Sequence, residues 1–177
     1  MSLRKLAATS RPAPDSYPVD DPTRPSIRWM IRMDLPEVLQ IDHESFSPSW
    51  TEQDFCYLLA KPRCIGMVIE LPRPNVSLVG FMLYELYENR IVLVNFAVSP
   101  SHRRIGIGTQ LMDHLKHKLS SHRRTRIVLE VRETNLNAQL FFRSQKFRAT
   151  KLIRRSYDDT GEDAIYMSYR SGDNGPH

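Results

Sequence analysis

The sequence predicts an α/β (α+β) protein built on a mixed, mostly antiparallel, twisted sheet of about seven strands flanked by about four helices. Short apolar runs of strand length alternate along the chain with segments whose apolar residues recur at helical spacing. Two of these runs, 64–71 and 76–86, are separated by a short turn containing proline and asparagine, which predicts a hairpin. A third run, 91–98, leads through a glycine-containing turn into a helix. A length of 177 residues suits one domain with a sizeable core.

The first part of the chain is expected to form a tail, a strand and two helices. Residues 1–26 hold five of the twelve prolines and lack apolar periodicity, so we expect a disordered N-terminal tail. A short strand is expected at 27–32. Asp34 is a suitable N-cap for a helix over 35–45, whose apolar residues lie on one side. Thr51 begins a second helix, because an aspartate three residues later completes an approximate capping box.

The remaining elements follow from the same two patterns. Leu111, Leu115 and Leu119 recur four residues apart, which is the stripe of an amphipathic helix. A further helix is expected at 135–144. Strands are expected at 126–131, 147–154 and 164–169, and a disordered C-terminal tail at 172–177.

Composition and charge narrow the class of protein. An apolar content of 41% and a charged content of 25% are typical of soluble globular proteins. No apolar run approaches the roughly 20 residues of a membrane span, and the N-terminus lacks a signal-peptide core, so no membrane partner is expected. Two cysteines without CxxC spacing favour a reducing, cytoplasmic location. The formal charge of +5 suits anionic ligands, but the basic residues are spread along the chain, so nucleic acid is not indicated as a partner.

The segment after the 91–98 strand carries a phosphate-binding pattern. It reads RRIGIG at 103–108 and leads into a helix. The first turn of a helix has N–H groups without internal partners, and the helix dipole favours negative charge there. Gly106 and Gly108 let a ligand approach the backbone closely. No third glycine follows as in GxGxxG and no lysine follows as in the Walker loop, so these two phosphate loops are excluded.

With Val98 and Pro100 before it, this RxxGxG pattern resembles the acetyl-CoA pyrophosphate loop of the GCN5-related N-acetyltransferase (GNAT) superfamily. Further blocks resemble its RimI-like branch, the ribosomal-protein alanine or peptide N-terminal acetyltransferases. These blocks are LEVRETN at 129–135, LFFRSQKF at 140–147 and IRRSY at 153–157. In FSPSWTEQDF at 46–55, the proline lies one place earlier than in the family. The resemblance implies a GNAT fold over 27–171, acetyl-CoA as donor, and a protein or peptide N-terminus as acceptor, with a ribosomal protein among the candidates.

The resemblance also implies contacts with the cofactor. Part of the 91–98 strand corresponds to a bulged strand whose backbone binds the pantetheine arm, and the loop after it cradles the pyrophosphate mostly through backbone amides. Asn135 matches a cofactor contact, although a plain helix N-cap explains an asparagine there as well. The residues with an implied contact to acetyl-CoA are Phe96, Ala97, Val98, Arg103, Arg104, Ile105, Gly106, Ile107, Gly108, Thr109, Asn135 and Phe142.

Glu130 is the candidate general base. A carboxylate at the end of the apolar run 127–129 is unusual, and burial there would raise its pKa and suit it to accept a proton near neutral pH. The matching glutamate is the base in RimI-type enzymes, where it acts on the acceptor amine. A structural ion pair with Arg132 or Arg154 is the alternative role.

The general acid is the point at which the chain departs from the family. In the RimI-like branch a tyrosine protonates the leaving CoA thiolate, and Phe142 stands at that position here. Tyr157 is the candidate substitute; an equal alternative is that it lines the acceptor groove, and Ser144 and water also stay open. Because a thiol with a pKa near about 8.5 is a tolerable leaving group, an acid helps without being indispensable.

Other interpretations remain open at this point. His114 and His117 lie three residues apart beside lysines, which is typical of a solvated helix face, and no metal is expected. A small-molecule amine or a lysine side chain is an alternative acceptor, because the fold alone does not select one. A weakly active acetyl-CoA-binding module is a further alternative, suggested by Phe142.

Overall fold

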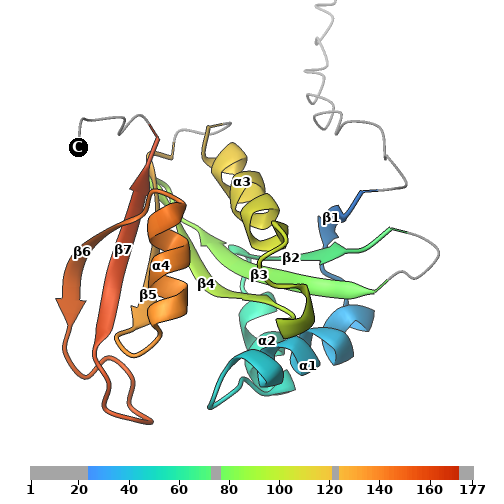
Figure 1. Cartoon of the computed structure of the whole chain (residues 1–177), viewed down its shortest axis with the longest axis horizontal. Coiled ribbons are helices and arrows are strands. Elements are labelled where there is room, and N and C mark those ends of the chain that lie inside the picture. Colours follow the sequence, from blue (N-terminus) through green and yellow to red (C-terminus); the bar gives the residue numbers. More distant parts are fainter. Residues whose placement is uncertain (1–23, 73–76, 121–123, 172–177) are drawn as a thin grey trace, which may run out of the picture.

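Seven strands form one mixed sheet within the residues that the structure describes, which are 24–72, 77–120 and 124–171 of a computed structural model. The strands are β1 (Ser26–Trp29), β2 (Cys64–Glu70), β3 (Leu78–Leu86), β4 (Arg90–Val98), β5 (Arg126–Arg132), β6 (Arg148–Ile153) and β7 (Ala164–Arg170). The helices are α1 (Leu35–Ser45), α2 (Glu52–Leu59), α3 (Ile107–Ser120) and α4 (Leu136–Ser144), with short 3-10 helices η1 (Arg32–Asp34) and η2 (Pro100–His102). The strand order is β1-β2-β3-β4-β5-β7-β6 (Figure 1). The predicted fold class is confirmed.

The sheet is antiparallel throughout except between β4 and β5. These two strands run parallel and pair only over Arg90–Val92 and Arg126–Val128. Beyond this short ladder, β4 continues beside β3 and β5 continues beside β7. The two strands therefore separate toward the end of the molecule drawn at the bottom of Figure 1.

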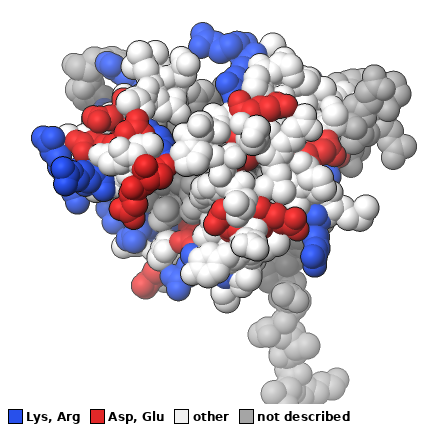
Figure 2. All heavy atoms as spheres, turned by 90° about the horizontal axis from the view of Figure 1, so that it is seen from below, with Lys and Arg blue, Asp and Glu red and all other residues white. Residues whose placement is uncertain are grey.

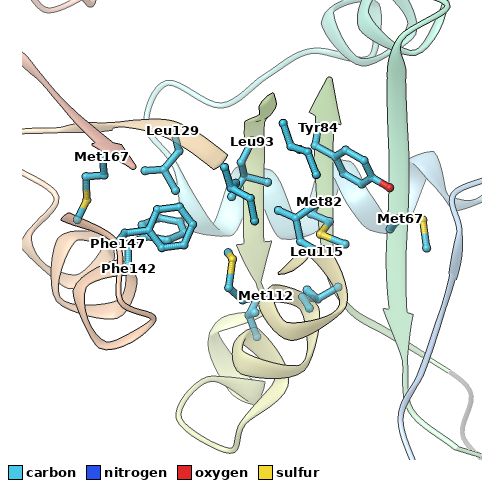
Figure 3. Packing of buried hydrophobic residues seen from close by; sticks show 14 of the residues in the cluster. Met67, Met82, Tyr84, Leu93, Met112, Leu115, Leu129, Phe142, Phe147 and Met167 are labelled. Atoms are coloured by element: carbon cyan, nitrogen blue, oxygen red, sulfur yellow. The ribbon is translucent and has the colours of Figure 1, made fainter. Parts of the chain in front are cut away.

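The core has two layers, one on each face of the sheet. Phe81 and Leu83 of β3 point to the layer that holds α1 and α2, whereas Met82 and Tyr84 point to the layer that holds α3 and α4. This follows from the alternation of side chains along a strand, and it explains why β3 is apolar on both faces. Figure 3 shows the second layer, in which α3 presents Met112 and Leu115 to the sheet.

Most element predictions agree with the structure, and the differences are local. Thr51 forms the predicted capping box at the start of α2. The first strand is shorter than predicted, because η1 begins at Arg32. Asp34 makes no capping bond to α1; its carboxylate instead accepts from Nη1 and Nη2 of Arg28, at 2.8 and 2.9 Å. The predicted tails lie outside the described residues, except for 24–26. In the described part of the chain, no helix combines the length and apolar character needed to cross a membrane.

Candidate active site

A cleft lies where β4 and β5 separate. Its walls come from these two strands, from α4, and from the α1–α2 and β6–β7 connections. Figure 2 looks at this end of the molecule, where acidic and basic side chains lie in small groups with uncharged surface between them. The cleft is lined by Phe46, Pro48, Trp50, Leu93, Val94, Asn95, Phe96, Leu129, Glu130, Val131, Arg132, Asn135, Ala138, Phe142 and Tyr157. Phe96, Glu130, Asn135, Phe142 and Tyr157, all candidate site residues from the sequence, therefore meet in one cleft.

β4 carries a bulge beside the cleft. Leu83 and Tyr84 are adjacent in β3 but pair with Asn95 and Leu93, so Val94 is an extra residue in β4. Beyond its short ladder with β5, the edge of β4 that faces the cleft pairs with no other strand of the described residues. Backbone groups on such an edge can bond an extended ligand as another strand would. The bulged strand implied by the resemblance is confirmed, and its contact with a cofactor stays a prediction.

The side chains at the end of β4 pack into the protein. Ala97 is buried in the layer of α1, and Val98 is buried in the layer of α3. Phe96 is half-buried and stacks on Phe141 of α4, with ring centroids 5.5 Å apart. For Ala97 and Val98, only the backbone is left to meet a ligand.

The loop before α3 has the geometry of an anion site. Arg104 and Gly106 adopt the left-handed backbone region, with φ of 67° and 93°, and this turns the chain into the helix. Ile107, Gly108 and Thr109 lie in the first helical turn, where no helix carbonyl can accept their N–H groups. The space at the missing Cβ of Gly106 is open. A pyrophosphate fits this arrangement, because it is an anion at a helix N-terminus that the backbone can approach closely.

The side chains of the loop at 103–108 differ in their burial and in their contacts. Ile107 is buried, whereas Arg104 and Ile105 are exposed. A Cβ on Gly108 would come within 3.2 Å of the Phe141 ring, so glycine permits close packing of α3 against α4. Arg103 donates from Nε to the Val98 carbonyl (2.9 Å) and from Nη2 to the Ser45 hydroxyl (2.9 Å). These bonds assign the Arg103 side chain to support of the loop, and its contact with a cofactor stays a prediction.

Asn135, at the start of α4, and Phe142, within α4, both line the cleft. The Asn135 side chain caps α4 by accepting the Ala138 N–H at 3.1 Å, so the helix-cap role is confirmed and the cofactor contact is untested. Phe142 is 6% exposed and packs edge-on against Phe141 and Phe147, with centroids 5.2 and 5.6 Å away. Phe142 therefore supplies an apolar wall without a proton to donate.

Glu130 lies exposed on β5 in the cleft and is not buried with the apolar residues that precede it. It lies two residues beyond Val128, the last residue of β5 that pairs with β4, and none of the described strands covers its cleft side. Its carboxylate accepts the Ser156 hydroxyl at 3.3 Å. Among the described residues it makes no ion pair, because Arg132 binds Asp159 and Glu162 while Arg154 binds Asp163. The ion-pair alternative is therefore not what the structure shows.

Tyr157 is half-buried in the same cleft, on the β6–β7 connection. Its backbone N–H donates to the Glu162 carbonyl at 3.2 Å, and the Arg132 guanidinium lies over its ring. Burial raises the pKa of the Tyr157 phenol, although Arg132 opposes that rise. The phenol is therefore protonated near neutral pH and is able to donate a proton.

Two features of the cleft wall were not anticipated from the sequence. Arg132 holds the β6–β7 connection, and the buried carboxylate of Asp42 bonds Trp50 and Asn95. One signal was present for Asp42, because it lies four residues after Val38 on the apolar stripe of α1. A charged residue on such a stripe needs a buried partner, which the sequence does not identify.

His114 differs from the solvated residue expected at its position. It is half-buried on α3, and burial lowers its pKa to about 4. His117 is exposed, as expected. Among the described residues, no group of three or more histidine, cysteine, aspartate or glutamate side chains is arranged to hold a metal ion.

Comparisons with known proteins agree with this arrangement. The profile of the acetyltransferase (GNAT) family matches residues 32–147. The ribosomal protein bS18-alanine N-acetyltransferase of Escherichia coli is 28% identical over 137 residues, which cover 76% of this chain and 90% of that protein. The crystal structure of the ribosomal-protein-S18-alanine N-acetyltransferase from Escherichia coli matches with a TM-score of 0.72 and 26% identity, over 86% of this chain and 99% of that chain. Arabidopsis thaliana NAA60 in complex with acetyl-CoA shares the fold, with a TM-score of 0.72 and 16% identity over 83% of this chain and 99% of that chain.

A mixed sheet that opens between two parallel strands, with the N-terminus of α3 after one of them, thus occurs in a fold that matches a solved N-acetyltransferase. The chain belongs to the acetyltransferase (GNAT) family and is an N-acetyltransferase, similar to the RimI-type enzymes.

Proposed function

We propose that residues 27–171 transfer acetyl from acetyl-CoA to the N-terminal α-amine of a protein or peptide, by direct attack in a ternary complex in the cytoplasm. The observation that carries this proposal is the cleft, which brings the bulged strand β4 together with Glu130 and Tyr157. The relative from Escherichia coli is named for alanine N-acetylation of ribosomal protein bS18. A ribosomal protein N-terminus is therefore the first acceptor to test.

The cofactor half of the site is formed mainly by backbone. Acetyl-CoA supplies the activated thioester. The loop at 103–109 would hold its pyrophosphate through N–H groups at the start of α3, and the free edge of β4 would bond its extended arm. Phe96 and Phe142 exclude water from the cleft side of α4 because they present apolar rings there.

The acceptor half of the site requires a base. An α-ammonium group has a pKa of about 7.7–8.0, so a weak base suffices to remove its proton near neutral pH. The Glu130 carboxylate takes that proton, directly or through one water molecule. Its exposure in the cleft keeps it in contact with solvent, to which the proton is then released.

Tyr157 is the proposed general acid. Its phenol is held protonated by burial and lies in the cleft that holds Glu130. It donates its proton to the departing thiolate, in place of the tyrosine that Phe142 replaces. Its position on the β6–β7 connection makes it part of the cleft lining, together with residues of β4 and β5.

The proposal is tested by thiol release from acetyl-CoA with a panel of peptides. Peptides with a free α-amine should release CoA, and the same peptides with a blocked N-terminus and one internal lysine should not. If only the blocked lysine peptides or small amines are acetylated, the acceptor is a lysine side chain or a small-molecule amine instead of an N-terminal α-amine. If acetyl-CoA raises the melting temperature but no amine is acetylated, the protein is an acetyl-CoA-binding module and not an active enzyme.

A further inference from the structure

Asp42 is a buried carboxylate that no step of the proposed chemistry uses. It lies in the last turn of α1 and is 0% exposed. Burial raises its pKa, and the bonds that it accepts from Asn95 and Trp50 oppose that rise. A buried carboxylate is costly unless it is bonded, and an apolar residue of similar size would complete the stripe of α1 without that cost. The position of Asp42 therefore needs a reason other than core packing.

The partners of Asp42 come from two other parts of the cleft wall. Its Oδ2 accepts the backbone N–H of Trp50 at 2.7 Å, and its Oδ1 accepts the Asn95 amide at 2.8 Å. Its backbone carbonyl accepts the N–H of Phe46 at 2.9 Å. All three partners line the cleft, yet Asp42 itself does not. One residue behind the wall thus joins the α1–α2 connection to β4, next to the bulge at Val94.

We propose that Asp42 is a positioning residue for the acceptor: through Trp50 and Asn95 it fixes the wall formed by the α1–α2 connection at a set distance from the bulged strand. This inference rests on the proposed function, because it assigns the acceptor to the cleft that both this connection and Glu130 line. Trp50 is further held by an edge-on contact with the Phe55 ring, at 5.4 Å between centroids. Backbone bonds to a carboxylate are charge-assisted, so Asp42 constrains the main chain more firmly than a neutral partner would.

The same end of α1 also reaches the cofactor loop. Ser45, three residues after Asp42, accepts a bond from Arg103, which in turn bonds the carbonyl of Val98 at the end of β4. The last turn of α1 is therefore anchored at two places, to β4 through Asp42 and to the loop after β4 through Ser45. Because Arg103 makes the second anchor independently, loss of the Asp42 bonds should affect the acceptor wall and leave the cofactor loop in place.

A donor–acceptor swap tests the inference. In Asp42→Asn, both bonds lose their charge assistance, and the contact with Asn95 persists only if the Asn95 amide turns its oxygen toward the new Nδ2. In the double variant D42N/N95D, the amide at 42 donates to the new carboxylate at 95, and its carbonyl still accepts the Trp50 N–H. We expect D42N to raise the KM for the acceptor peptide about tenfold with little change in the KM for acetyl-CoA, and the swap to recover most of this loss. Asp113→Asn, at an exposed position on α3, is the matched control.

The position of the wall has its own readout. Replacing the exposed Trp29 with phenylalanine leaves Trp50 as the one tryptophan, and its emission should shift to the red in D42N and return in the swap. Should D42N not fold, Asn95→Ala removes the same bond from the other side and should raise the peptide KM in the same way. A D42N enzyme with wild-type peptide KM and emission would overturn the inference, as would equal weakening of both substrates. Absence of acetylation by the wild-type enzyme on every peptide would instead refute the proposed function, and the fluorescence would still report whether Asp42 holds the wall.

Discussion

The guanidinium carbon of Arg132 lies 3.9 Å from the centroid of the Tyr157 ring. The same guanidinium donates to Asp159 at 2.7 Å and to Glu162 at 2.6 Å. It also donates to the Thr160 hydroxyl at 2.8 Å, so one side chain from β5 contacts four residues of the β6–β7 connection, which carries Tyr157 into the cleft. A planar fork with several donors suits this task, whereas a lysine offers a single charged point.

Replacing Arg132 with methionine should loosen Tyr157 without touching the cofactor loop. We expect the KM for the acceptor peptide to rise about tenfold while the Kd for acetyl-CoA changes little, because charge-assisted bonds are lost on the acceptor side alone. Steady-state kinetics and calorimetry measure the two quantities. Arg154→Met is the matched control, since Arg154 is exposed and makes one ion pair, at 3.4 Å, with Asp163. Equal losses for both substrates would show that Arg132 supports the whole cleft instead.

Glu130→Gln should slow the reaction most at neutral pH. A glutamine keeps the size of the side chain but cannot take the proton of the ammonium group, so kcat should fall about a hundredfold near pH 7. The deficit should shrink as the pH rises above about 8, because the amine then loses its proton to solvent. A pH–rate profile for both enzymes measures this, with the exposed Glu133→Gln as control. Full activity of E130Q at neutral pH would exclude Glu130 as the base.

Tyr157→Phe separates the two roles of the phenol. If it protonates the thiolate, kcat should fall about tenfold, a modest loss because a thiol is a tolerable leaving group. The KM for the peptide should stay close to that of the wild type. The exposed Tyr57→Phe on α2 serves as the control. Unchanged kcat with a raised peptide KM would make Tyr157 a residue of the acceptor groove.

Local sequence patterns predicted the helices and strands, whereas the arrangement of the cleft depends on contacts between residues that are distant in sequence. The limits of α1 and the capping box at Thr51 depend on residues close in sequence, so they were predictable. The exposure of Glu130 depends on where β4 and β5 stop pairing, which no window of β5 contains. Its apolar neighbours therefore suggested burial. The hydrogen bond from Arg103 to Ser45 was not predictable from local sequence either, because the two residues lie 58 positions apart in the chain.

The resemblance to the GNAT superfamily predicted some features of the cleft that apolar periodicity alone did not. It implied the bulged strand and the meeting of Glu130 with Tyr157 in one cleft, both of which the structure contains. It did not imply the hydrogen bond between Asp42 and Asn95. A polar pair between a helix and a strand 53 residues apart leaves no periodic signal, and only an unexpected charge on an apolar stripe indicates it.

His114 should make the stability of the fold depend on pH. Burial lowers its pKa from 6.5 to about 4, so the unfolded chain binds a proton that the folded chain resists. The free energy of unfolding is independent of the titration of His114 above about pH 6.5 and falls progressively as the pH drops toward the folded pKa, and solvent screening keeps this loss below about 2 kcal/mol near pH 5. Urea unfolding at a neutral and a mildly acidic pH measures the loss. His114→Gln should remove that part of the pH dependence, whereas His117→Gln, exposed on the same helix, should retain it. Parallel curves for the wild type and H114Q would show that other groups titrate in this range.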